Sequence, residues 1–337
     1  MKRKTFLFLI VLTSSLFLFA CGSSKKGNNE TEDNEKDWPK GISVSAATIG
    51  GTFHDYATGW GELIQDEMGV SVNVEATDGP IPNIKLVENN DSPIGLVNMG
   101  VAYEGYEGIE WADKKYENIR SLFPMYISYL HWFSMPGANI ENVMDLDGKI
   151  VGTGAKDGTP DYFGKKVFDD LDIKPKRIVN AGFSDYADQM RDGNLDTAGT
   201  FSPTGHPTAM EMVKTENANI IGVGEESSEL AEKYGISSGI IEANSYEGQE
   251  EDIETLAVYS AYIVNKDLSD DFVYNLVKTT YENKESLVNV RKEFEDLNLD
   301  DVPEALGNVP IHPGAIKYYE EKEIELPDTA YPPEYEK

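Results

Sequence analysis

Gly50, Gly51, Thr52 and Phe53 combine backbone freedom, a hydroxyl group and an aromatic ring between an apolar run and the expected first turns of a helix. Backbone N–H groups of such a loop, at the positive end of a helix, can bind an anion. A nucleotide-binding loop would also contain a lysine and a third glycine at fixed spacing, and the loop lacks both. The loop is therefore a candidate for binding a small solute other than a nucleotide.

The sequence contains no familiar motif for covalent, metal or nucleotide chemistry. It has no Walker A sequence, no G-x-S-x-G elbow and no GxGxxG fingerprint after a strand. Its four histidines, His54, His131, His206 and His312, are scattered without an HExxH or comparable metal-ligand spacing. His206 begins an expected helix, where it could contact a ligand or lie in a surface turn. We therefore expect a protein without catalytic residues, metal or cofactor, with an enzyme on the same fold as the contrasting hypothesis.

Four more loops carry small polar residues where an expected strand ends and a helix begins. They are residues 77–83, 98–103, 153–159 and 201–207. Ligands of open α/β sheets bind at such loops, outside the carboxyl ends of the strands. The candidate ligand-binding residues are Thr48, Gly50, Gly51, Thr52, Phe53, Asp78, Gly79, Asn83, Asn98, Tyr103, Thr153, Asp157, Gly158, Thr159, Phe201 and Thr204.

Short apolar runs alternate with amphipathic helical patterns along the chain, which is typical of parallel sheets covered by helices. We therefore predict an α/β fold. Helices are expected at 162–171 and after the cap residue Ser269, and Tyr56 and Trp60 are expected in the core. The expected strands are 41–48, 70–77, 93–99, 121–135, 149–154, 177–182, 196–202, 219–224 and 255–265.

The two longest strand candidates, 121–135 and 255–265, flank a self-contained block of alternating strands and helices. A chain that leaves one lobe, builds a second and then returns would place two crossings side by side, as a hinge. We therefore predict a discontinuous lobe 1 from residues 41–135 and 239–337, a lobe 2 from residues 136–238, and a ligand cleft between the lobes.

The first residues have the pattern of an export signal, because a basic start precedes an apolar run from Phe6 to Ala20. The only cysteine, Cys21, follows directly, and "LFLFACGSS" resembles the signal of a bacterial lipoprotein, in which this cysteine is lipidated. Residues 21–40 are polar and are predicted to form a flexible tether. With residues 1–20 as a lipoprotein signal peptide, we expect an extracytoplasmic protein that is lipid-anchored to the outer face of the cell membrane.

The charge of the chain limits its partners. The formal net charge is -31 at pH 7, which argues against nucleic acid and against peripheral binding to anionic lipid. It does not exclude an anionic ligand, because exposed charges are screened over about 8 Å at physiological ionic strength.

Five segments occur in a particular order: "ATIGGTFHDYATGWGELI", "VEATDGPIPNIKLVENNDSPIGLVNMGVAYEGYEG", "MDLDGKIVGTG", "ANSYEGQEEDIETLAV" and "VPIHPGAIKYYEE". In order and spacing they resemble the solute-binding proteins of TAXI-type TRAP transporters, over residues 41–324. The resemblance implies a two-lobed type II periplasmic-binding-protein-like fold that closes on a small carboxylate such as glutamate or 2-oxoglutarate. It also implies a TRAP membrane permease as partner, fused or two-component and driven by an ion gradient. The solute-binding lipoprotein of an ATP-driven importer or a sensor is the alternative.

The glycine-rich loops match those of the family only in part. Residues 50–53 match its Gly-Gly-Thr-aromatic pattern. Its Thr-Gly-Gly-Ser-x-x-Asn loop appears as "TDGPIPN" over residues 77–83, so that Asp78 replaces a glycine and Pro80 a serine. Its Gly-Ser-Gly-Thr loop in lobe 2 ends here in "DGT", with Asp157 in the serine position.

The two aspartates in these loops bear on the nature of the ligand. If Asp78 and Asp157 face the cleft, they oppose the roughly 0.3 to 1 kcal/mol that each helix N-terminus offers an anion. We therefore hypothesise a solute with a positive group as well as a carboxylate, such as an amino acid. The alternative is that both aspartates are solvated or cap helices.

Overall fold

The computed structural model describes residues 38–335, which lie in one compact unit. The predicted export signal and the predicted lipidation site Cys21 lie outside the described residues, as does most of the predicted tether.

Trp38 is the first described residue, and its side chain packs on α8 (Asp270–Glu282). Its ring packs against Phe272 with the centroids 5.8 Å apart, and its indole N–H donates a hydrogen bond to a carboxylate oxygen of Asp271 at 2.7 Å. The end of the segment expected as tether is therefore packed on the protein.

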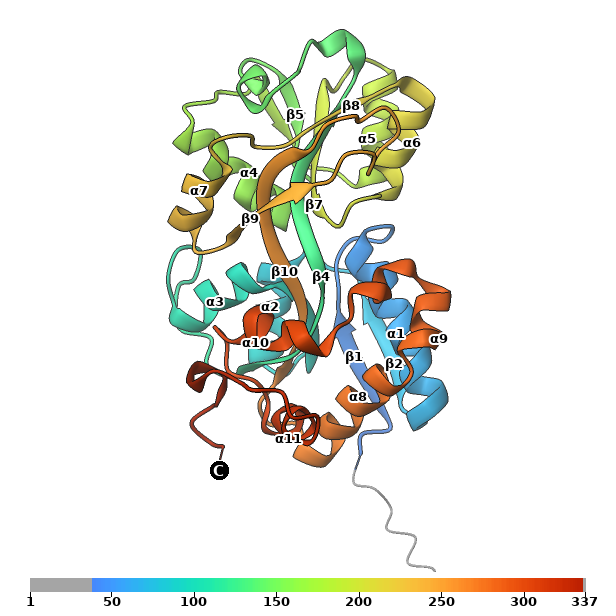
Figure 1. The fold of residues 1–337 in the computed structure, drawn as a ribbon, viewed down its shortest axis with the longest axis vertical. Coiled ribbons are helices and arrows are strands. Elements are labelled where there is room, and N and C mark those ends of the chain that lie inside the picture. Colours follow the sequence, from blue (N-terminus) through green and yellow to red (C-terminus); the bar gives the residue numbers. More distant parts are fainter. Residues whose placement is uncertain (1–37, 336–337) are drawn as a thin grey trace, which may run out of the picture. The chain divides into compact units, whose positions relative to one another are not determined.

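Residues 38–335 form an α/β structure (Figure 1). The strands are β1 (Gly41–Ser45), β2 (Ser71–Glu75), β3 (Ile94–Asn98), β4 (Ile119–Ser134), β5 (Ile150–Gly152), β6 (Arg177–Val179), β7 (Thr197–Ser202), β8 (Asn219–Ile221), β9 (Ser237–Ile241) and β10 (Ile253–Asn265). The α-helices are α1 (Thr52–Met68), α2 (Pro80–Glu88), α3 (Met99–Glu107), α4 (Thr159–Asp170), α5 (Phe183–Arg191), α6 (Pro207–Glu216), α7 (Ser227–Tyr234), α8 (Asp270–Glu282), α9 (Lys284–Val290), α10 (Val302–Leu306) and α11 (Pro313–Glu321). The 3-10 helices are η1 (Pro136–Ala138), η2 (Val143–Leu146), η3 (Lys292–Asp296), η4 (Leu299–Asp301) and η5 (Asp328–Ala330).

All nine predicted strands are present, with shorter bounds at several ends. Strand β9 was not predicted, because "SSGII" is short and mostly solvent-exposed, and so gives no apolar run. It pairs with β10 in antiparallel orientation.

Two long strands connect the lobes. In the sheet, the strand order is β2-β1-β3-β10-β4-β7-β5-β6. The first half of β4 pairs with β10 in lobe 1, and its second half, from Tyr129 to Ser134, pairs with β7 in lobe 2. Figure 1 shows β4 and β10 running side by side from one lobe into the other. These are the two strands that the sequence predicted as the hinge.

The strands that carry the predicted loops are parallel within each lobe. In lobe 1, β1 pairs in parallel with β2 and β3, and in lobe 2, β5 pairs in parallel with β6 and β7. The carboxyl ends of parallel strands meet at one edge of a sheet, so the loops after β1, β2 and β3 lie together, and so do those after β5, β6 and β7.

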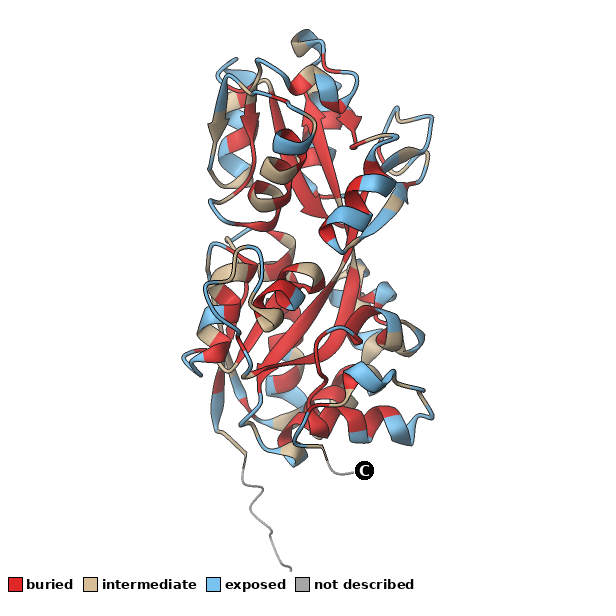
Figure 2. Ribbon diagram, turned by 90° about the vertical axis from the view of Figure 1, so that its left-hand side faces the viewer, coloured by how far each residue is buried: buried red, intermediate tan, exposed pale blue. Residues whose placement is uncertain are grey.

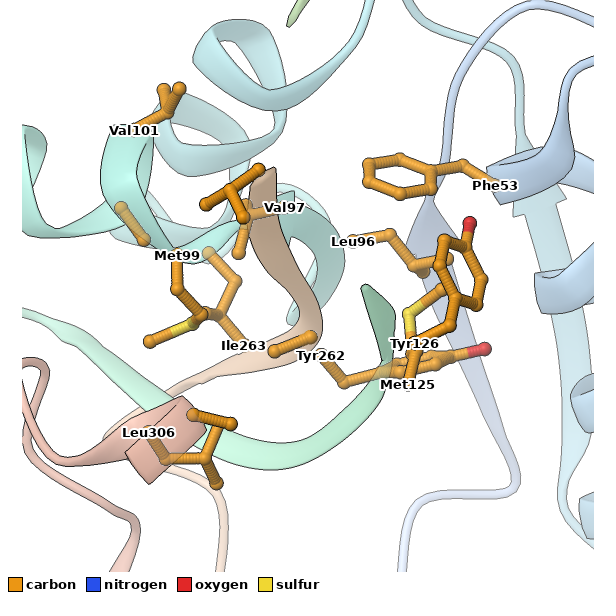
Figure 3. Close-up of a cluster of buried hydrophobic side chains, with 14 of the residues drawn as sticks. Phe53, Leu96, Val97, Met99, Val101, Met125, Tyr126, Tyr262, Ile263 and Leu306 are labelled. Carbon is orange, nitrogen blue, oxygen red and sulfur yellow. The ribbon is translucent and has the colours of Figure 1, made fainter. Parts of the chain in front are cut away.

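The larger apolar cluster continues from lobe 1 into lobe 2, and a smaller cluster lies within lobe 2 (Figure 2). In lobe 1, the ring of Tyr56 stacks on Phe294 at 3.6 Å, and the indole N–H of Trp60 donates to the hydroxyl of Thr280 at 2.8 Å. Both predicted core residues are therefore confirmed. Figure 3 shows the lobe 1 core, in which the side chain of Phe53 lies above Leu96 and close to the hydroxyl of Tyr126.

Helix α8 begins where the sequence predicted, because the hydroxyl of Ser269 accepts a hydrogen bond from the N–H of Phe272 at 3.3 Å. No helix among the described residues is long and apolar enough to span a membrane.

Candidate functional site

A cavity of about 70 Å³ lies between the lobes and is called the interlobe cavity here. Of the predicted ligand-binding residues, those that line it are Thr48, Gly51, Thr52, Phe53, Asp78, Gly79, Gly158, Thr159 and Phe201. The other lining residues are Ala47, Pro80, Tyr126, Gly154, Ala155, Pro160, Phe183, Thr200, Ser202 and His206, of which the sequence raised only His206 as a possible ligand contact.

Helix N-termini converge on the interlobe cavity. Gly51, Gly79 and Gly158 are the N-cap residues of α1, α2 and α4, all three line the cavity, and none provides a side-chain cap. Two more helices begin at the same cavity, since Phe183 is the first residue of α5 and His206 is the N-cap of α6. Proline removes N–H groups from the first turns of α2 (Pro80 and Pro82), α4 (Pro160) and α6 (Pro207), but the remaining N–H groups and the helix dipoles still favour a negative charge at this place.

The close approach of the lobes explains two of these glycines. A Cβ atom on Gly158 would lie 3.0 Å from the carbonyl oxygen of Asp78, which belongs to the other lobe. Gly79 has φ of +125°, and a Cβ atom there would lie 3.3 Å from the Cα of Gly158. Glycine at both positions therefore allows the two backbones to meet.

The side chains that line the interlobe cavity are mostly neutral. Hydroxyl groups come from Thr52, Thr200 and Ser202, and the hydroxyl of Thr200 donates to that of Ser202 at 3.1 Å. Asp78, which is exposed, is the one charged side chain among the described lining residues. The electrostatic preference for an anion therefore comes from the helix ends and not from lysine or arginine.

Two buried polar side chains in the lining have no hydrogen-bond partner among the described residues. They are the hydroxyl of Tyr126 and both ring nitrogens of His206, and each residue is 2% exposed. Burial raises the pKa of Tyr126 well above its usual value, so its hydroxyl keeps its proton and can donate. An unpaired buried polar group costs about 1 to 3 kcal/mol, which a solute that pairs with it would recover.

Contacts between the lobes border the cavity. The hydroxyl of Thr159 in α4 donates to the side-chain oxygen of Asn98 in lobe 1, and the Asn98 amide donates to the hydroxyl of Ser260 at 3.1 Å. The hydroxyl of Tyr162 donates to the carboxylate of Glu104 at 2.8 Å. Asn98 was predicted to contact the ligand, but its side chain is buried in this interlobe contact.

Two further predicted residues support the loops and do not line the interlobe cavity. The amide of Asn83, which is fully buried, donates to the carbonyl oxygens of Ala46 and Leu96. The hydroxyl of Thr153, also buried, donates to the carboxylate of Asp161 at 2.6 Å. Buried carbonyl oxygens and a buried carboxylate need hydrogen-bond donors, and Asn83 and Thr153 supply them. The sequence does not show which buried acceptors a side chain will meet.

The remaining predicted residues lie elsewhere. Asp157 is exposed, with φ of +62°, and its N–H donates to the carboxylate of Asp161 at 3.0 Å. Gly50, at φ of +82°, turns the first loop without lining the cavity. Tyr103 is 36% exposed on α3 and lines a different hollow. Thr204 is exposed and lines a second large cavity.

That second cavity measures about 600 Å³ and borders β4, β10 and η3. Its lining includes the carboxylates of Glu242, Glu295, Asp296 and Asp301. Burial raises the pKa of Asp296, and the charge of Glu295 raises it further. The lining also contains one lysine, Lys284, but the four carboxylates outnumber it and disfavour an anion, in contrast to the helix N-termini at the interlobe cavity.

Some of the missed lining residues left a signal in the sequence. Thr200 and Ser202 are the direct neighbours of the predicted residue Phe201 at the carboxyl end of β7, so their place at the strand end could have identified them. Tyr126 lies in the middle of β4, far from any loop, because the hinge strand itself forms a wall of the cavity. A search confined to strand ends cannot find such a residue.

Among the described residues no group of three or more His, Cys, Asp or Glu side chains is arranged to hold a metal ion.

Comparison with solved structures finds low sequence identity over most of the chain. An ancestral arginine-binding protein bound to arginine is 15% identical, over 76% of this chain and 98% of that one, with a TM-score of 0.49. A putative L-cystine ABC transporter from Listeria monocytogenes is 14% identical, over 76% and 95%, with a TM-score of 0.47. AbpA, an amino acid ABC transporter substrate-binding protein from Streptococcus pneumoniae bound to L-arginine, is 14% identical, over 77% and 97%, with a TM-score of 0.44.

Comparison with protein families identifies one match that spans most of the chain. It extends over residues 44–322 and so includes every loop that lines the interlobe cavity. The protein belongs to the NMT1-like family.

Proposed function

We propose that the protein is the extracytoplasmic solute-binding subunit of a TAXI-type TRAP transporter. It captures a small carboxylate or amino acid, such as glutamate or 2-oxoglutarate, by closure of its two lobes. It then delivers the solute to a TRAP permease, fused or two-component, that an ion gradient drives. A lipid on Cys21 holds it at the outer face of the cell membrane.

The observation that carries the proposal is the convergence of uncapped helix N-termini on a cavity between two lobes. Gly51 and Gly79 bring two of these ends from lobe 1, and Gly158 brings a third from lobe 2. A carboxylate placed among them takes hydrogen bonds from both lobes at once. None of the described lining residues forms a nucleophile and base pair, so the site is suited to binding and not to turnover.

Closure follows from the position of the solute between the lobes. A solute that first contacts the loops of lobe 1 favours the closed arrangement only through its additional contacts with lobe 2. The interlobe bond from Thr159 to Asn98 then forms, and the surface that spans both lobes is completed for the permease.

The test is isothermal calorimetry with a panel of small carboxylates, including L-glutamate and 2-oxoglutarate, on the protein and on Thr52→Val. Thr52 lines the cavity, and valine keeps its shape without the hydroxyl. We expect a bound carboxylate and a loss of about tenfold or more in affinity in the variant, as for one hydrogen bond to a charged group. Thr58→Val is the matched control, because Thr58 is exposed on the same helix and bonds only within it. No binding by any member of the panel would refute the proposal.

The energy source is tested separately, in proteoliposomes that contain the permease. Uptake that depends on an imposed ion gradient and needs no ATP supports the TRAP assignment. Uptake that requires ATP would instead assign the protein to an ATP-driven importer.

A further inference from the structure

A chain of buried hydrogen bonds runs from the interlobe cavity to the two hinge strands. Thr159, the first residue of α4, lines the cavity and donates through its hydroxyl to the side-chain oxygen of Asn98 at the end of β3. The Asn98 amide donates to the hydroxyl of Ser260 in β10 at 3.1 Å. The Ser260 hydroxyl in turn lies 2.9 Å from that of Ser128 in β4. Asn98, Ser260 and Ser128 are each at most 1% exposed, and the four residues are called the hinge relay here.

The hinge relay fixes the orientation of the Asn98 amide. This side chain has one oxygen that accepts and one nitrogen that donates. Because the nitrogen is bonded to Ser260, the oxygen is turned toward Thr159 and accepts its hydroxyl. The Ser260 hydroxyl is itself held by its bond with Ser128. Without the Ser260 hydroxyl, the buried amide would lose its acceptor, and the orientation that suits Thr159 would lose its support.

The pairing of β4 with β10 is irregular beside the hinge relay. Between Pro124 and Ile127, β4 has two residues where β10 has only Ser260. The extra residue forms a β-bulge, which bends the strand that carries it. Pro124 also has no N–H to contribute to the ladder, so the pairing is weaker at the same place. The hinge strands are therefore easiest to bend next to Ser260.

Strand β4 passes from lobe 1 into lobe 2 directly after Ser128. Its pairing with β10 ends at Tyr129, and its pairing with β7 begins at that residue. Asn98 and Ser260 are opposite each other in the β3–β10 pair, so the bond between them stays within lobe 1. When lobe 2 rotates about this part of β4, the relay bond that forms or breaks is the one from Thr159 to Asn98.

We propose that Ser260 and Ser128 are positioning residues for solute capture. Neither lines the interlobe cavity. They act through Asn98, whose oxygen they hold toward Thr159, so that the closed arrangement gains a buried hydrogen bond between the lobes. The inference rests on the proposed closure of the lobes on a solute, and it identifies residues that set how long the closed state lasts.

The relay acts on the release of the solute and not on its capture. A solute first meets the loops of one lobe in the open protein, where the bond from Thr159 to Asn98 is not yet made. Loss of the relay should therefore raise the dissociation rate constant and leave the association rate constant nearly unchanged.

The experiment measures both rate constants by stopped-flow fluorescence, with L-glutamate and 2-oxoglutarate as probes. In Ser260→Ala the dissociation rate constant should rise about fivefold, as for the loss of one net hydrogen bond, while the association rate constant changes less than about twofold. Ser128→Ala should act in the same direction by a smaller factor. Ser260→Thr keeps the hydroxyl and should restore most of the wild-type rate. Ser121→Ala is the matched control, because Ser121 is buried in β4 and donates to the carbonyl of Val309 within lobe 1 at 2.8 Å.

A double-mutant cycle distinguishes positioning from a general loss of structure. Thr159→Val removes the hydroxyl that the relay positions. In this background Ser260→Ala should cause no further rise in the dissociation rate constant, because Ser260 acts through the bond from Thr159 to Asn98. A merely structural role would give the same factor in both backgrounds. Far-ultraviolet circular dichroism and thermal unfolding confirm that each variant is folded.

X-ray scattering without solute tests the relay independently of any ligand. The bond from Thr159 to Asn98 joins the lobes in the structure itself, so Ser260→Ala and Thr159→Val should each have a larger radius of gyration than the wild type, and Ser121→Ala the same radius.

The outcomes separate the two proposals. Where a probe binds, an unchanged dissociation rate constant in Ser260→Ala, or an equal factor in both backgrounds of the cycle, overturns the role of Ser260 and leaves the proposed function standing. Where neither probe nor any member of the wider panel binds, the proposed function fails. The scattering then decides the relay, and equal radii in the wild type and in Ser260→Ala overturn it.

Discussion

Replacing Asn83 by alanine should destabilise the protein, although the sequence suggested a residue that contacts the ligand. The Asn83 side chain is fully buried and makes three hydrogen bonds. Its amide donates to the carbonyls of Ala46 and Leu96, and its oxygen accepts from the hydroxyl of Thr77 at 2.7 Å. These bonds tie the loop before α2 to the ends of β1 and β3.

The magnitude follows from these contacts. Each hydrogen bond contributes a net of about 1 kcal/mol, so removing three lowers the free energy of unfolding by about 3 kcal/mol. The carbonyls of Ala46 and Leu96 are left without this partner, and the small cavity created by the substitution adds to the loss. For a chain of this size we expect the unfolding temperature to fall by about 6 °C or more.

Urea unfolding, followed by tryptophan fluorescence, measures the effect. The midpoint should fall in Asn83→Ala while the slope m stays the same, because the surface exposed on unfolding does not change. Asn73→Ala is the control, since Asn73 is exposed on β2 and bonds only to Glu75 on the same strand. It should change stability by less than about 0.5 kcal/mol. An unchanged midpoint in Asn83→Ala, together with weaker solute binding, would show that Asn83 contacts the solute after all.

Three further predictions test closure and pH dependence. In Gly158→Val the new side chain meets the carbonyl of Asp78 across the cleft and hinders closure of the lobes. Calorimetry should therefore show an affinity for the solute that is lower by about tenfold or more, and X-ray scattering should show a larger radius of gyration. Tyr162→Phe removes the 2.8 Å hydrogen bond to Glu104 between the lobes and should lower affinity by about tenfold, with wild-type affinity as the contrary result. Burial lowers the pKa of His312 to about 4, whereas an unfolded imidazole titrates near 6.5. The unfolded state therefore binds more protons, and stability should fall as pH drops from about 6.5 to 4, by about 3 kcal/mol for this residue. His312→Asn can still cap α11 and should flatten that fall in urea titrations, so an unaltered pH profile would contradict the assignment.

The strands and the hinge could be predicted because their signals are local. Long apolar runs over 121–135 and 255–265 correspond to β4 and β10, and their separation in sequence implied an inserted lobe. The short strand β9 could not be predicted in this way, because its stability comes from pairing with β10 and not from its own side chains.

For the candidate site, the sequence located glycines that line the interlobe cavity but did not give the direction of the polar side chains. The glycines Gly51, Gly79 and Gly158 all line the interlobe cavity, since a glycine at a helix start points to close approach of the backbone. Polar side chains such as Asn83 and Thr153 were placed in the right loops but turn inward, toward main-chain and carboxylate partners that come from distant segments. Only the three-dimensional structure supplies those partners.

The sheet order also determines when lobe 1 can be completed as the chain is synthesised. Strand β10 lies between β3 and β4 in the sheet, yet it follows both of them by more than a hundred residues of chain. Until residues 253–265 arrive, the edges of β3 and β4 lack their shared neighbour and offer open hydrogen-bonding groups to other chains. Strands β5 and β7 precede β10 and do not pair with it, although Ile241 and Tyr246 also join the core of lobe 2, so pulse-labelled hydrogen exchange should find the amides of β5 and β7 protected before those of β3.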